Sequence, residues 1–546
     1  MVRDAVLCTA LRHEAEWVSS TCRAWHIAAM TLDPRLYDAW AHLPDYLGNH
    51  VLVSLTALAL GLGISLPLAI VSMRRPMLRG ALLGIASVIQ TIPGIALLAL
   101  FYPLLLALAA ASDNIFGASF SALGFLPSVL ALALYSMLPV LRNTVTGLNG
   151  VDPRLREAAR IVGMTPARSL REIELPLAMP VIMAGIRTSA VWVIGTATLA
   201  TPIGQTSLGN YIFAGLQTQN WVFVIFGCVA AAALALLVDF LLAQMERGVR
   251  LRSRARILGG GLGLLLVVLA ALAPSFGAVQ GTYVVGTKSF TEQYVLGALI
   301  QQRLTAQGLS SERRDGLGSA VLFKALIAGD VDVYVDYSGT IWANYMKHSD
   351  VKPREVVLAD VAQWLKTTYG VRMLGGLGFE NAYALAMPSK RAESLGINSI
   401  ADLAAHSGQM TIGGDYEFFD RPEWKAIRDA YGLRFKDQRS MQPTFMYQAA
   451  VNGDVDVVAA FSSDGQIAKY DLKLLDDPKQ AIPPYDAVLL IGPGRAGDAK
   501  LAAALKPLIG AIPVATMQEA NLRASSTGAS PGEVARWLWR KIGPQK

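Results

Sequence analysis

The sequence predicts two parts of different fold class: an all-α polytopic membrane part with about six transmembrane helices, then a bilobed α/β domain. Three observations carry this prediction. Of the 546 residues, 53% are hydrophobic and 16% are charged, whereas soluble domains carry about a quarter charged residues. The long apolar runs are confined to about 50–275, and 282–546 has the mixed composition of a soluble domain. The chain is also too long for a single domain.

Six segments are apolar over about 20 residues, which is the length that crosses a bilayer. They lie at roughly 51–73, 81–110, 122–142, 182–203, 221–244 and 257–274. The second segment contains Pro93 and Pro103. Because proline removes a helical hydrogen bond and clashes with the preceding turn, we expect this span to be kinked or broken.

Arginines gather at alternate ends of these spans, which indicates how the chain is oriented. They are concentrated at 74–79, 149–175 and 246–256, and Lys and Arg mark cytoplasmic loops. The loops at 111–121 and 204–220 are nearly free of both residues and are expected outside. Everything after residue 275 is then expected outside as well. This distribution accounts for the net charge of +7, so nucleic-acid binding is not expected.

The two ends of the membrane part allow alternative interpretations. Residues 1–49 would form an N-terminal extracytoplasmic segment, in which Met30 could be the true start. The sixth span precedes Phe276-Gly277-Ala278, so it could be a signal peptide that is cleaved after small residues. Five earlier spans favour an uncleaved anchor, and we therefore expect a membrane anchor and linker at 249–281.

The C-terminal part alternates short β-branched runs with helical patterns, which is typical of α/β domains with mostly parallel sheets. We expect two lobes that divide near 385–388 and again near 488–491, which gives two crossing strands. A ligand would bind between the lobes, and hinge closure would bury it. The expected strands include 283–285, 331–334 and 455–460, and the expected helices include 291–306, 319–328 and 425–431.

The loop between the third and fourth spans carries a spaced motif. Glu157-Ala158-Ala159 is followed after three residues by Gly163, and after nine more by Ile173-Glu174-Leu175-Pro176. Asp152-Pro153 predicts a helix start, and Gly163 predicts the turn that ends this helix. Pro166 would begin a second short helix that Pro176 ends. Two short helices at an angle would form a rigid knob.

This motif resembles the EAA loop of ATP-binding-cassette (ABC) importer permeases. The resemblance implies a permease domain at 50–248 with the EAA loop at 150–180, docked on a separate ATPase. The chain has no G-x-x-x-x-G-K-[ST] phosphate loop of its own. The family would then require a homodimer with two ATPase subunits. The matching docking positions are Glu157, Ala158, Ala159, Gly163, Ile173, Leu175 and Pro176.

Five motifs in 282–546 resemble the substrate-binding proteins of osmoprotectant importers, which take up glycine betaine, choline, carnitine and related quaternary amines. The resemblance covers nearly all of 282–546, and 50–275 resembles the permease partner of the same systems. The motifs are Val285-Gly286-Thr287-Lys288-Ser289-Phe290-Thr291-Glu292-Gln293, Val331-Asp332-Val333-Tyr334-Val335-Asp336-Tyr337-Ser338-Gly339-Thr340, Gly378-Phe379-Glu380-Asn381-Ala382-Tyr383-Ala384, Phe461-Ser462-Ser463-Asp464-Gly465 and Pro483-Pro484-Tyr485.

By motif position, the resemblance implies an aromatic cage of four residues. A trimethylammonium group has no N–H to donate, and each aromatic ring contributes about 0.5–2 kcal/mol to binding such a cation when it is desolvated. Phe461 departs from the tyrosine usual at its position and lacks the hydroxyl. The cage residues are Tyr337, Tyr383, Phe461 and Tyr485.

Three further positions match the family's partners for a ligand carboxylate: Lys288, Thr340 and Arg421. An arginine can hold a carboxylate with two parallel hydrogen bonds. Arg421 could equally pair with Glu417 or Glu423. Because choline has no carboxylate, these residues bear on the preference between betaine and choline.

The predicted function is the transmembrane and substrate-binding subunit of an ATP-driven importer for quaternary amine osmoprotectants. The predicted location is the cytoplasmic (inner) membrane, with the binding domain outside. A ligand-gated channel or sensor with a bilobed extracellular domain is an alternative, although a channel needs no ATPase-docking loop. An ABC importer for another small polar solute is a second alternative. Only six histidines occur and none belongs to a metal-spaced or catalytic motif, so we expect neither enzyme activity, metal nor cofactor.

Overall fold

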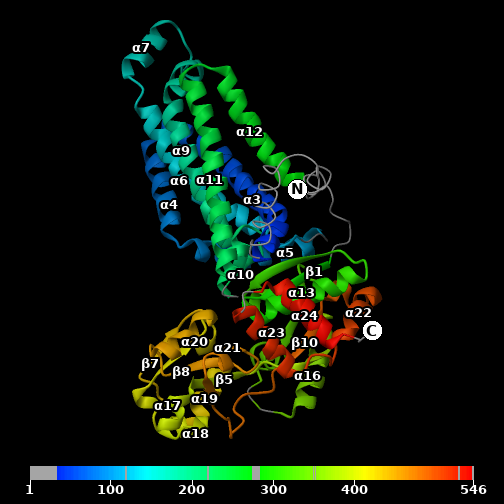
Figure 1. The fold of residues 1–546 in the computed structure, drawn as a ribbon. Coiled ribbons are helices and arrows are strands. Elements are labelled where there is room, and N and C mark those ends of the chain that lie inside the picture. Colours follow the sequence, from blue (N-terminus) through cyan, green and yellow to red (C-terminus); the bar gives the residue numbers. More distant parts are fainter. Residues whose placement is uncertain are drawn as a thin grey trace, which may run out of the picture.

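The computed structural model describes residues 34–116, 120–217, 220–273, 283–348, 350, 352–526 and 529–543. It consists of a bundle of long helices and an α/β domain that lies at one end of the bundle (Figure 1). The expectations about Met30 and about cleavage near Phe276-Gly277-Ala278 fall outside the described residues.

The helical bundle confirms the predicted spans. Five of its described helices are long and apolar enough to cross a membrane, or six if the bent pair α4 and α5 is one span. That pair bends by 105° at the break before Gly94, next to Pro93, whereas Pro103 lies within α5. The long helices are α3 (Pro34–Ser72), α4 (Pro76–Thr91), α5 (Gly94–Phe116), α6 (Phe125–Asn149), α9 (Leu175–Ala197), α11 (Trp221–Arg250) and α12 (Arg254–Leu272).

The first helix begins earlier than predicted, at Pro34 rather than near residue 51. The predicted boundary between residues 49 and 50 therefore falls inside α3 and separates no two elements. Residues 34–50 contain too many polar residues to be recognised as part of an apolar span. Their aromatic side chains nevertheless pack on neighbouring helices. The ring centroids of Tyr46 and Tyr211 are 4.8 Å apart, and those of Trp40 and Phe226 are 5.2 Å apart.

The loop between α6 and α9 folds into α7 (Pro153–Ile161), α8 (Pro166–Ser169) and the π-helical turn η1 (Leu170–Glu174). As predicted, Asp152 caps α7, and Gly163 has the positive φ of 77° that suits glycine at a helix end. Pro176 does not end the second helix, because η1 carries α8 directly into α9. Pro176 lies in the first turn of α9, where a missing N–H is tolerated. In Figure 1, α7 lies at the end of the bundle away from the α/β domain.

The α/β domain contains two five-stranded sheets, one in each lobe. Lobe I (283–380 and 486–543) has the strand order β2-β1-β3-β10-β4, and lobe II (383–474) has the order β7-β6-β8-β5-β9. The strands are β1 (Tyr283–Lys288), β2 (Ser311–Leu317), β3 (Val333–Tyr337), β4 (Arg372–Glu380), β5 (Tyr383–Pro388), β6 (Thr411–Gly414), β7 (Asp437–Ser440), β8 (Val457–Phe461), β9 (Leu472–Leu474) and β10 (Asp486–Ile491).

The sheets are mixed rather than mostly parallel. The pairs β1–β2, β1–β3, β6–β7 and β6–β8 are parallel. The strands β5 and β10 pair antiparallel with their neighbours, since each begins where the chain has just crossed from the other lobe. The crossings lie at 381–382 and 475–485. The positions predicted for them, 385–388 and 488–491, lie inside β5 and β10.

The helices of the α/β domain surround the sheets, and the predicted helices at 291–306 and 319–328 match α13 and α14. Further short 3-10 and π-helical turns join these helices to the strands. The helices are α13 (Thr291–Ala306), α14 (Ser319–Ala328), α15 (Ser338–Thr340), α16 (Arg354–Tyr369), α17 (Ser389–Leu395), α18 (Ile400–Ala404), α19 (Pro422–Tyr431), α20 (Pro443–Asn452), α21 (Gln466–Lys469), α22 (Ala499–Leu505), α23 (Val514–Ser526) and α24 (Pro531–Ile542).

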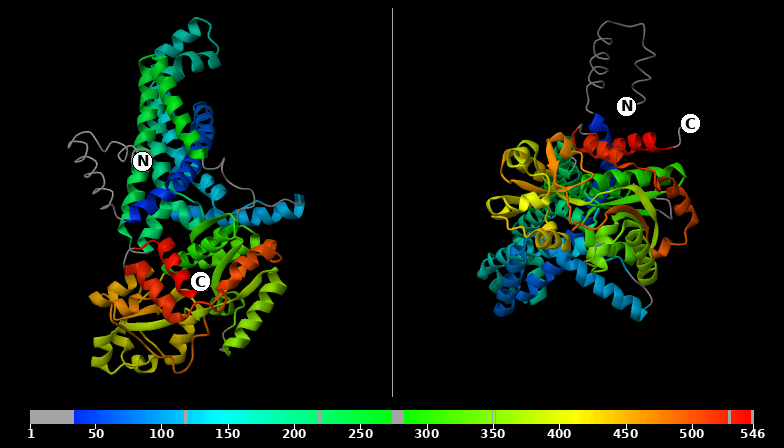
Figure 2. Two further views of the ribbon diagram at one scale, coloured as in Figure 1. Left: turned by 45° about the vertical axis from the view of Figure 1, so that its right-hand side comes forward. Right: turned by 90° about the horizontal axis from the view of Figure 1, so that it is seen from below.

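Lobe I touches the helical bundle at the end opposite α7. Strand β2 lies against the 3-10 turn η2 (Thr198–Ile203) and against α10 (Gly209–Gln217). Leu317 of β2 shares a buried apolar cluster with Tyr102 of α5. Arg313 of β2 lies close to Tyr46 of α3. Figure 2 shows α5 running across the bundle end next to the α/β domain. We call Arg313, Leu317, Tyr46 and Tyr102 the docking contact.

Candidate ligand-binding site

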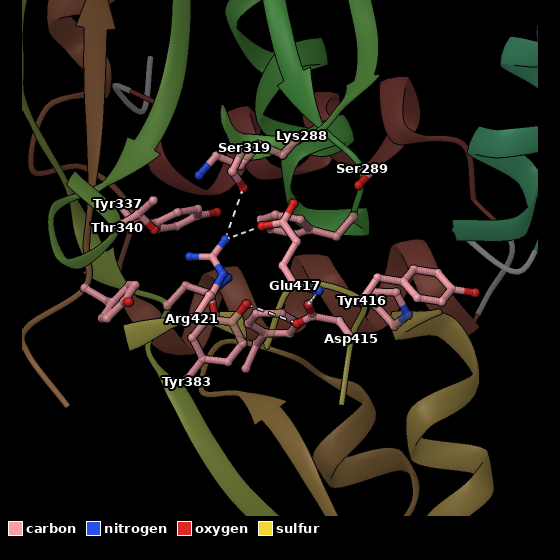
Figure 3. A pocket seen from close by; sticks show the side chains of 15 residues that line it. Lys288, Ser289, Ser319, Tyr337, Thr340, Tyr383, Asp415, Tyr416, Glu417 and Arg421 are labelled. Carbon is pink, nitrogen blue, oxygen red and sulfur yellow. Dashed lines mark hydrogen bonds and ion pairs between the residues drawn. The ribbon is translucent and has the colours of Figure 1, made fainter. Parts of the chain in front are cut away.

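A cavity of about 110 Å³ lies between the two lobes, and residues from both of them line it (Figure 3). A water molecule needs roughly 10–15 Å³ of such volume, so the cavity has room for a small solute. All seven residues predicted to bind substrate line it: Lys288, Tyr337, Thr340, Tyr383, Arg421, Phe461 and Tyr485.

Strand ends bring these side chains together. Lys288 is the last residue of β1 and Tyr337 is the last of β3, and these two strands are parallel neighbours in lobe I. Their carboxyl ends therefore open on the same edge of the sheet, where α/β folds bind ligands. In lobe II, Tyr383 begins β5 and pairs directly with Phe461 at the end of β8. Arg421 immediately precedes α19.

Six aromatic residues line the cavity, and five of their rings, all except that of Tyr416, form one cluster. The ring of Tyr383 lies 4.9 Å from that of Phe461 and 6.2 Å from that of Tyr485, between centroids. Phe290 was not among the predicted cage residues. It stacks on Phe461 at 5.7 Å and on Tyr337 at 6.1 Å. Its position two residues after the end of β1, within the first quoted motif, is the signal that could have identified it.

The tyrosine hydroxyls have partners in the protein. Tyr337 Oη donates to Glu292 Oε1 at 2.6 Å, and Tyr383 Oη donates to Asp415 Oδ2 at 3.0 Å. Tyr485 Oη donates to Glu423. These bonds fix the rings, and burial raises the pKa of all three hydroxyls well above the ordinary value, so they stay neutral. The carbon surfaces of the rings are then what the tyrosines offer a ligand.

Lys288 is buried in the cavity wall and is already paired. Its ammonium group forms an ion pair with Asp336, whose side chain is fully buried. The Nζ atom also lies 5.1 Å from the centroid of the Tyr337 ring. The charge of Lys288 therefore has a partner within lobe I, and its predicted contact with a ligand carboxylate stays a prediction. Thr340 lines the cavity from α15.

Arg421 enters the cavity from lobe II, with its Cζ atom 5.4 Å from the Tyr383 ring centroid. Its Nη2 atom donates to Glu417 and, at 3.2 Å, to Ser319 Oγ across the cleft. Its Nη1 atom lies 3.8 Å from Glu423 Oε1. The sequence left open whether Arg421 pairs with Glu417 or with Glu423, and the structure places both carboxylates beside it. Figure 3 shows the guanidinium between Ser319 and Glu417.

Polar groups that the sequence analysis did not single out complete the cavity. Asp415 and Glu417 follow the carboxyl end of β6, and Asn381 lies at the first crossing between lobes. Burial raises the pKa of Asp415. The Asn381 amide donates to Glu292 at 3.1 Å, but its buried Oδ1 atom has no hydrogen-bond partner. An unpaired buried acceptor is costly, and a ligand donor would satisfy it.

Gly339 has no side chain and so leaves the space that the Tyr485 ring occupies. A Cβ atom at this position would lie 2.3 Å from Tyr485 Cε2, which is closer than any real contact. We expect Gly339→Ala to displace the buried ring and to weaken ligand binding by roughly tenfold, because an overpacked site repacks at the expense of its geometry. Calorimetric titration would measure this. The nearby Gly376, where a Cβ meets nothing closer than 3.8 Å, provides the control Gly376→Ala.

The residues predicted to dock an ATPase lie on and beside α7. Glu157 and Ala158 are exposed, Ala159 is buried, and Gly163 forms the turn. Arg156 links the two short helical segments of this knob, because its Nε atom on α7 donates to Glu174 Oε2 on η1 at 3.1 Å. The other predicted positions follow at the start of α9 or just before it: Ile173, Leu175 and Pro176.

The knob exposes apolar side chains that its motif did not include. Ile161 is 85% exposed and Val162 is 73% exposed, at the tip between α7 and α8. Exposed apolar groups of this kind mark contact surfaces on proteins. The arrangement therefore provides a rigid projection with an apolar tip at the far end of the bundle from the cavity.

Comparison with protein families gives two matches that divide the chain as the structure does. Residues 281–541 match the substrate binding domain of the ABC-type glycine betaine transport system. Residues 59–251 match the binding-protein-dependent transport system inner membrane component.

Three relatives illustrate the similarity. The ergothioneine transport permease/ergothioneine binding protein EgtU of Helicobacter pylori is 28% identical over 484 residues, which cover 85% of this chain and 84% of that protein. The choline transport system permease protein OpuBB of Bacillus subtilis is 44% identical, over 36% of this chain and 84% of that protein. The carnitine transport binding protein OpuCC of Listeria monocytogenes is 28% identical, over 48% of this chain and 88% of that protein.

Proposed function

This chain belongs to the binding-protein-dependent ABC importers of the glycine betaine type, with permease and substrate-binding protein in one polypeptide, and we propose that its cavity captures a quaternary amine. The two family matches confirm the resemblance that the sequence motifs indicated. They also make the chain a multi-pass inner-membrane protein.

The cluster of five aromatic rings is the observation that carries this proposal. A quaternary ammonium group has no N–H and is attracted to ring faces, each contributing about 0.5–2 kcal/mol when water is excluded. The hydroxyls of Tyr337, Tyr383 and Tyr485 are held by buried acceptors, so the rings are positioned before a ligand arrives. A preformed cage of this kind lowers the cost of binding.

Arg421 supports a ligand that also carries a carboxylate. Burial alone would lower its pKa, but the carboxylates of Glu417 and Glu423 hold the pKa well above the usual value, so the guanidinium is charged. Glycine betaine and carnitine have a carboxylate to offer it, and choline does not.

A second candidate substrate is ergothioneine, which the Helicobacter pylori relative transports. Ergothioneine combines a trimethylammonium group and a carboxylate with an imidazole-type ring that has N–H donors. The unpaired Oδ1 atom of Asn381 would suit a ligand with a donor, which ergothioneine has in its ring, choline and carnitine have in their hydroxyl, and glycine betaine lacks.

The transport cycle that we propose uses the two ends of the bundle. The α/β domain lies outside the cell and presents its ligand to the permease. At the other end, α7 and its apolar tip dock on a separate ATPase subunit in the cytoplasm. One chain supplies half of the pathway, so two chains and two ATPase subunits form the importer. The opposite positions of α7 and the α/β domain in Figure 1 support this orientation.

Titration of the full-length chain in lipid nanodiscs tests the substrate class. We expect micromolar binding of at least one of glycine betaine, choline, carnitine and ergothioneine. Arg421→Ala should weaken glycine betaine by roughly tenfold or more, since it removes a charge-assisted pair, and should leave choline no weaker. If a folded chain binds none of the four ligands, the quaternary amine assignment is wrong.

A further inference from the structure

On one edge of the Arg421 guanidinium, only one of the two N–H-bearing nitrogens has a hydrogen-bond partner. A carboxylate binds arginine best when it bridges two neighbouring N–H groups, such as Nε and Nη2. In this structure Nη2 donates to Glu417 and to Ser319, while the buried Nε atom has no hydrogen-bond partner. An unsatisfied buried donor in a ligand cavity indicates a site for an acceptor that a ligand brings.

Glu417 is the partner of Arg421 that can move. Its side chain is 46% exposed, whereas that of Arg421 is 10% exposed. By contrast, Glu423 is fully buried and accepts from Asn344 at 3.0 Å and from Tyr485. A carboxylate fixed in this way cannot withdraw without breaking the wall of the cage, but Glu417 can turn toward solvent.

The backbone that carries Glu417 stays in place when the side chain turns. Asp415 Oδ1 accepts the backbone N–H groups of Glu417 at 2.8 Å and Phe418 at 3.0 Å. The turn is thus held by Asp415 and not by the ion pair with Arg421. Displacing the Glu417 carboxylate from the guanidinium requires only side-chain rotation.

The charges beside the guanidinium favour a ligand without a carboxylate while Glu417 stays in place. Arg421 carries one positive charge, and Glu417 and Glu423 carry two negative charges next to it. Burial would raise the pKa of Glu417, but Arg421, Lys288 and Ser319 outweigh it and lower the pKa, so Glu417 is ionised. A ligand carboxylate entering this group meets repulsion from Glu417 unless that side chain leaves.

We propose that Glu417 is an internal carboxylate that competes with the carboxylate of the ligand for Arg421, and thereby sets the preference between zwitterionic and purely cationic quaternary amines. A betaine displaces Glu417 and bridges Nε and Nη2 of the guanidinium. A choline-type cation leaves the Glu417–Arg421 pair intact and benefits from the excess negative charge. This inference rests on the proposed quaternary amine function.

The test compares Glu417→Gln with wild type, both as full-length chains in lipid nanodiscs, by calorimetry with glycine betaine and with choline. Removing the competing charge should tighten glycine betaine by roughly tenfold and leave choline equal or weaker, the size expected when one charge-assisted pair is relieved. Glu417→Ala, which removes the hydrogen-bond acceptor as well, should shift the ratio of the two dissociation constants in the same direction.

The chain offers a matched control in Glu519, which forms an i,i+4 pair with Arg523 at 2.8 Å on α23, outside the cavity. Glu519→Gln removes the same charge from the same kind of pair and should leave both affinities unchanged. An unchanged ratio in Glu417→Gln, or a shift toward choline, overturns the inference while the proposed function stands. If wild type binds neither of these amines but binds carnitine or ergothioneine, the inference fails while the proposed function stands; if it binds none of the four, the proposed function fails first.

Discussion

Replacing Tyr383 with alanine is expected to weaken the binding of a quaternary amine by about 30-fold, which corresponds to the roughly 2 kcal/mol of a desolvated cation–π contact. Tyr383 is central to the cage, because its ring touches those of Phe461 and Tyr485 and lies beneath Arg421. The substitution also removes the donor that the buried Asp415 accepts from. Calorimetry on the full-length chain would measure the change.

The variant Tyr383→Phe distinguishes the contribution of the ring to binding from that of the hydroxyl. It keeps the π face and loses only the hydrogen bond to Asp415, so most of the affinity should remain. If Tyr383→Phe binds as weakly as Tyr383→Ala, the hydroxyl and not the ring carries the effect, and the aromatic cage is wrong. Thermal unfolding of both variants would show whether either one has lost the fold of lobe II.

The double substitution Ile161→Asp, Val162→Asp is expected to reduce transport by roughly tenfold or more without changing ligand affinity. Both side chains are largely exposed at the tip of α7. In the free chain, aspartates there remain in water and cost little. In a complex with an ATPase the same charges would be buried in an apolar contact, which is costly for an unpaired carboxylate.

Ile161→Val is the conservative control, because it keeps the tip apolar and should transport normally. Uptake of labelled substrate by vesicles that contain the permease and its ATPase would provide the measurement, with calorimetry on the same variants. Normal uptake by the aspartate double variant would show that the tip of α7 does not contact the ATPase. A parallel loss of ligand binding would instead indicate misfolding.

The architecture could be predicted from the sequence because it depends on local sequence patterns. Apolar runs of membrane length are unambiguous, because about 20 apolar residues are enough to cross a bilayer. The predicted helices at 291–306 and 319–328 match α13 and α14 at both ends. The start of α3 was missed, since the contacts that extend it to Pro34 are made by Trp40 and Tyr46 with helices distant in the sequence.

The sequence predicted residues that line the cavity, but not the ion pairs that these residues form. Motif positions identified seven residues that line it, because strand ends carry ligand sites in α/β folds. They could not show that Lys288 is already paired with Asp336, or that Arg421 is shared between two carboxylates. Such pairings depend on which loops meet across the cleft. The strands expected at 385–388 and 488–491 are present as parts of β5 and β10, but their antiparallel pairing was not predicted, because it depends on where the chain crosses between the lobes.

The docking contact between β2 and the helical bundle changes the concentration dependence of the importer. In systems with a separate binding protein, each encounter with the permease is bimolecular and slows on dilution. Here residues 273–282 join α12 to β1, and Arg313 and Leu317 already touch the bundle of the same chain. Tethering through a short linker gives an effective concentration on the order of millimolar. The α/β domain therefore stays near its permease at any protein concentration, and delivery does not depend on a bimolecular encounter between the two.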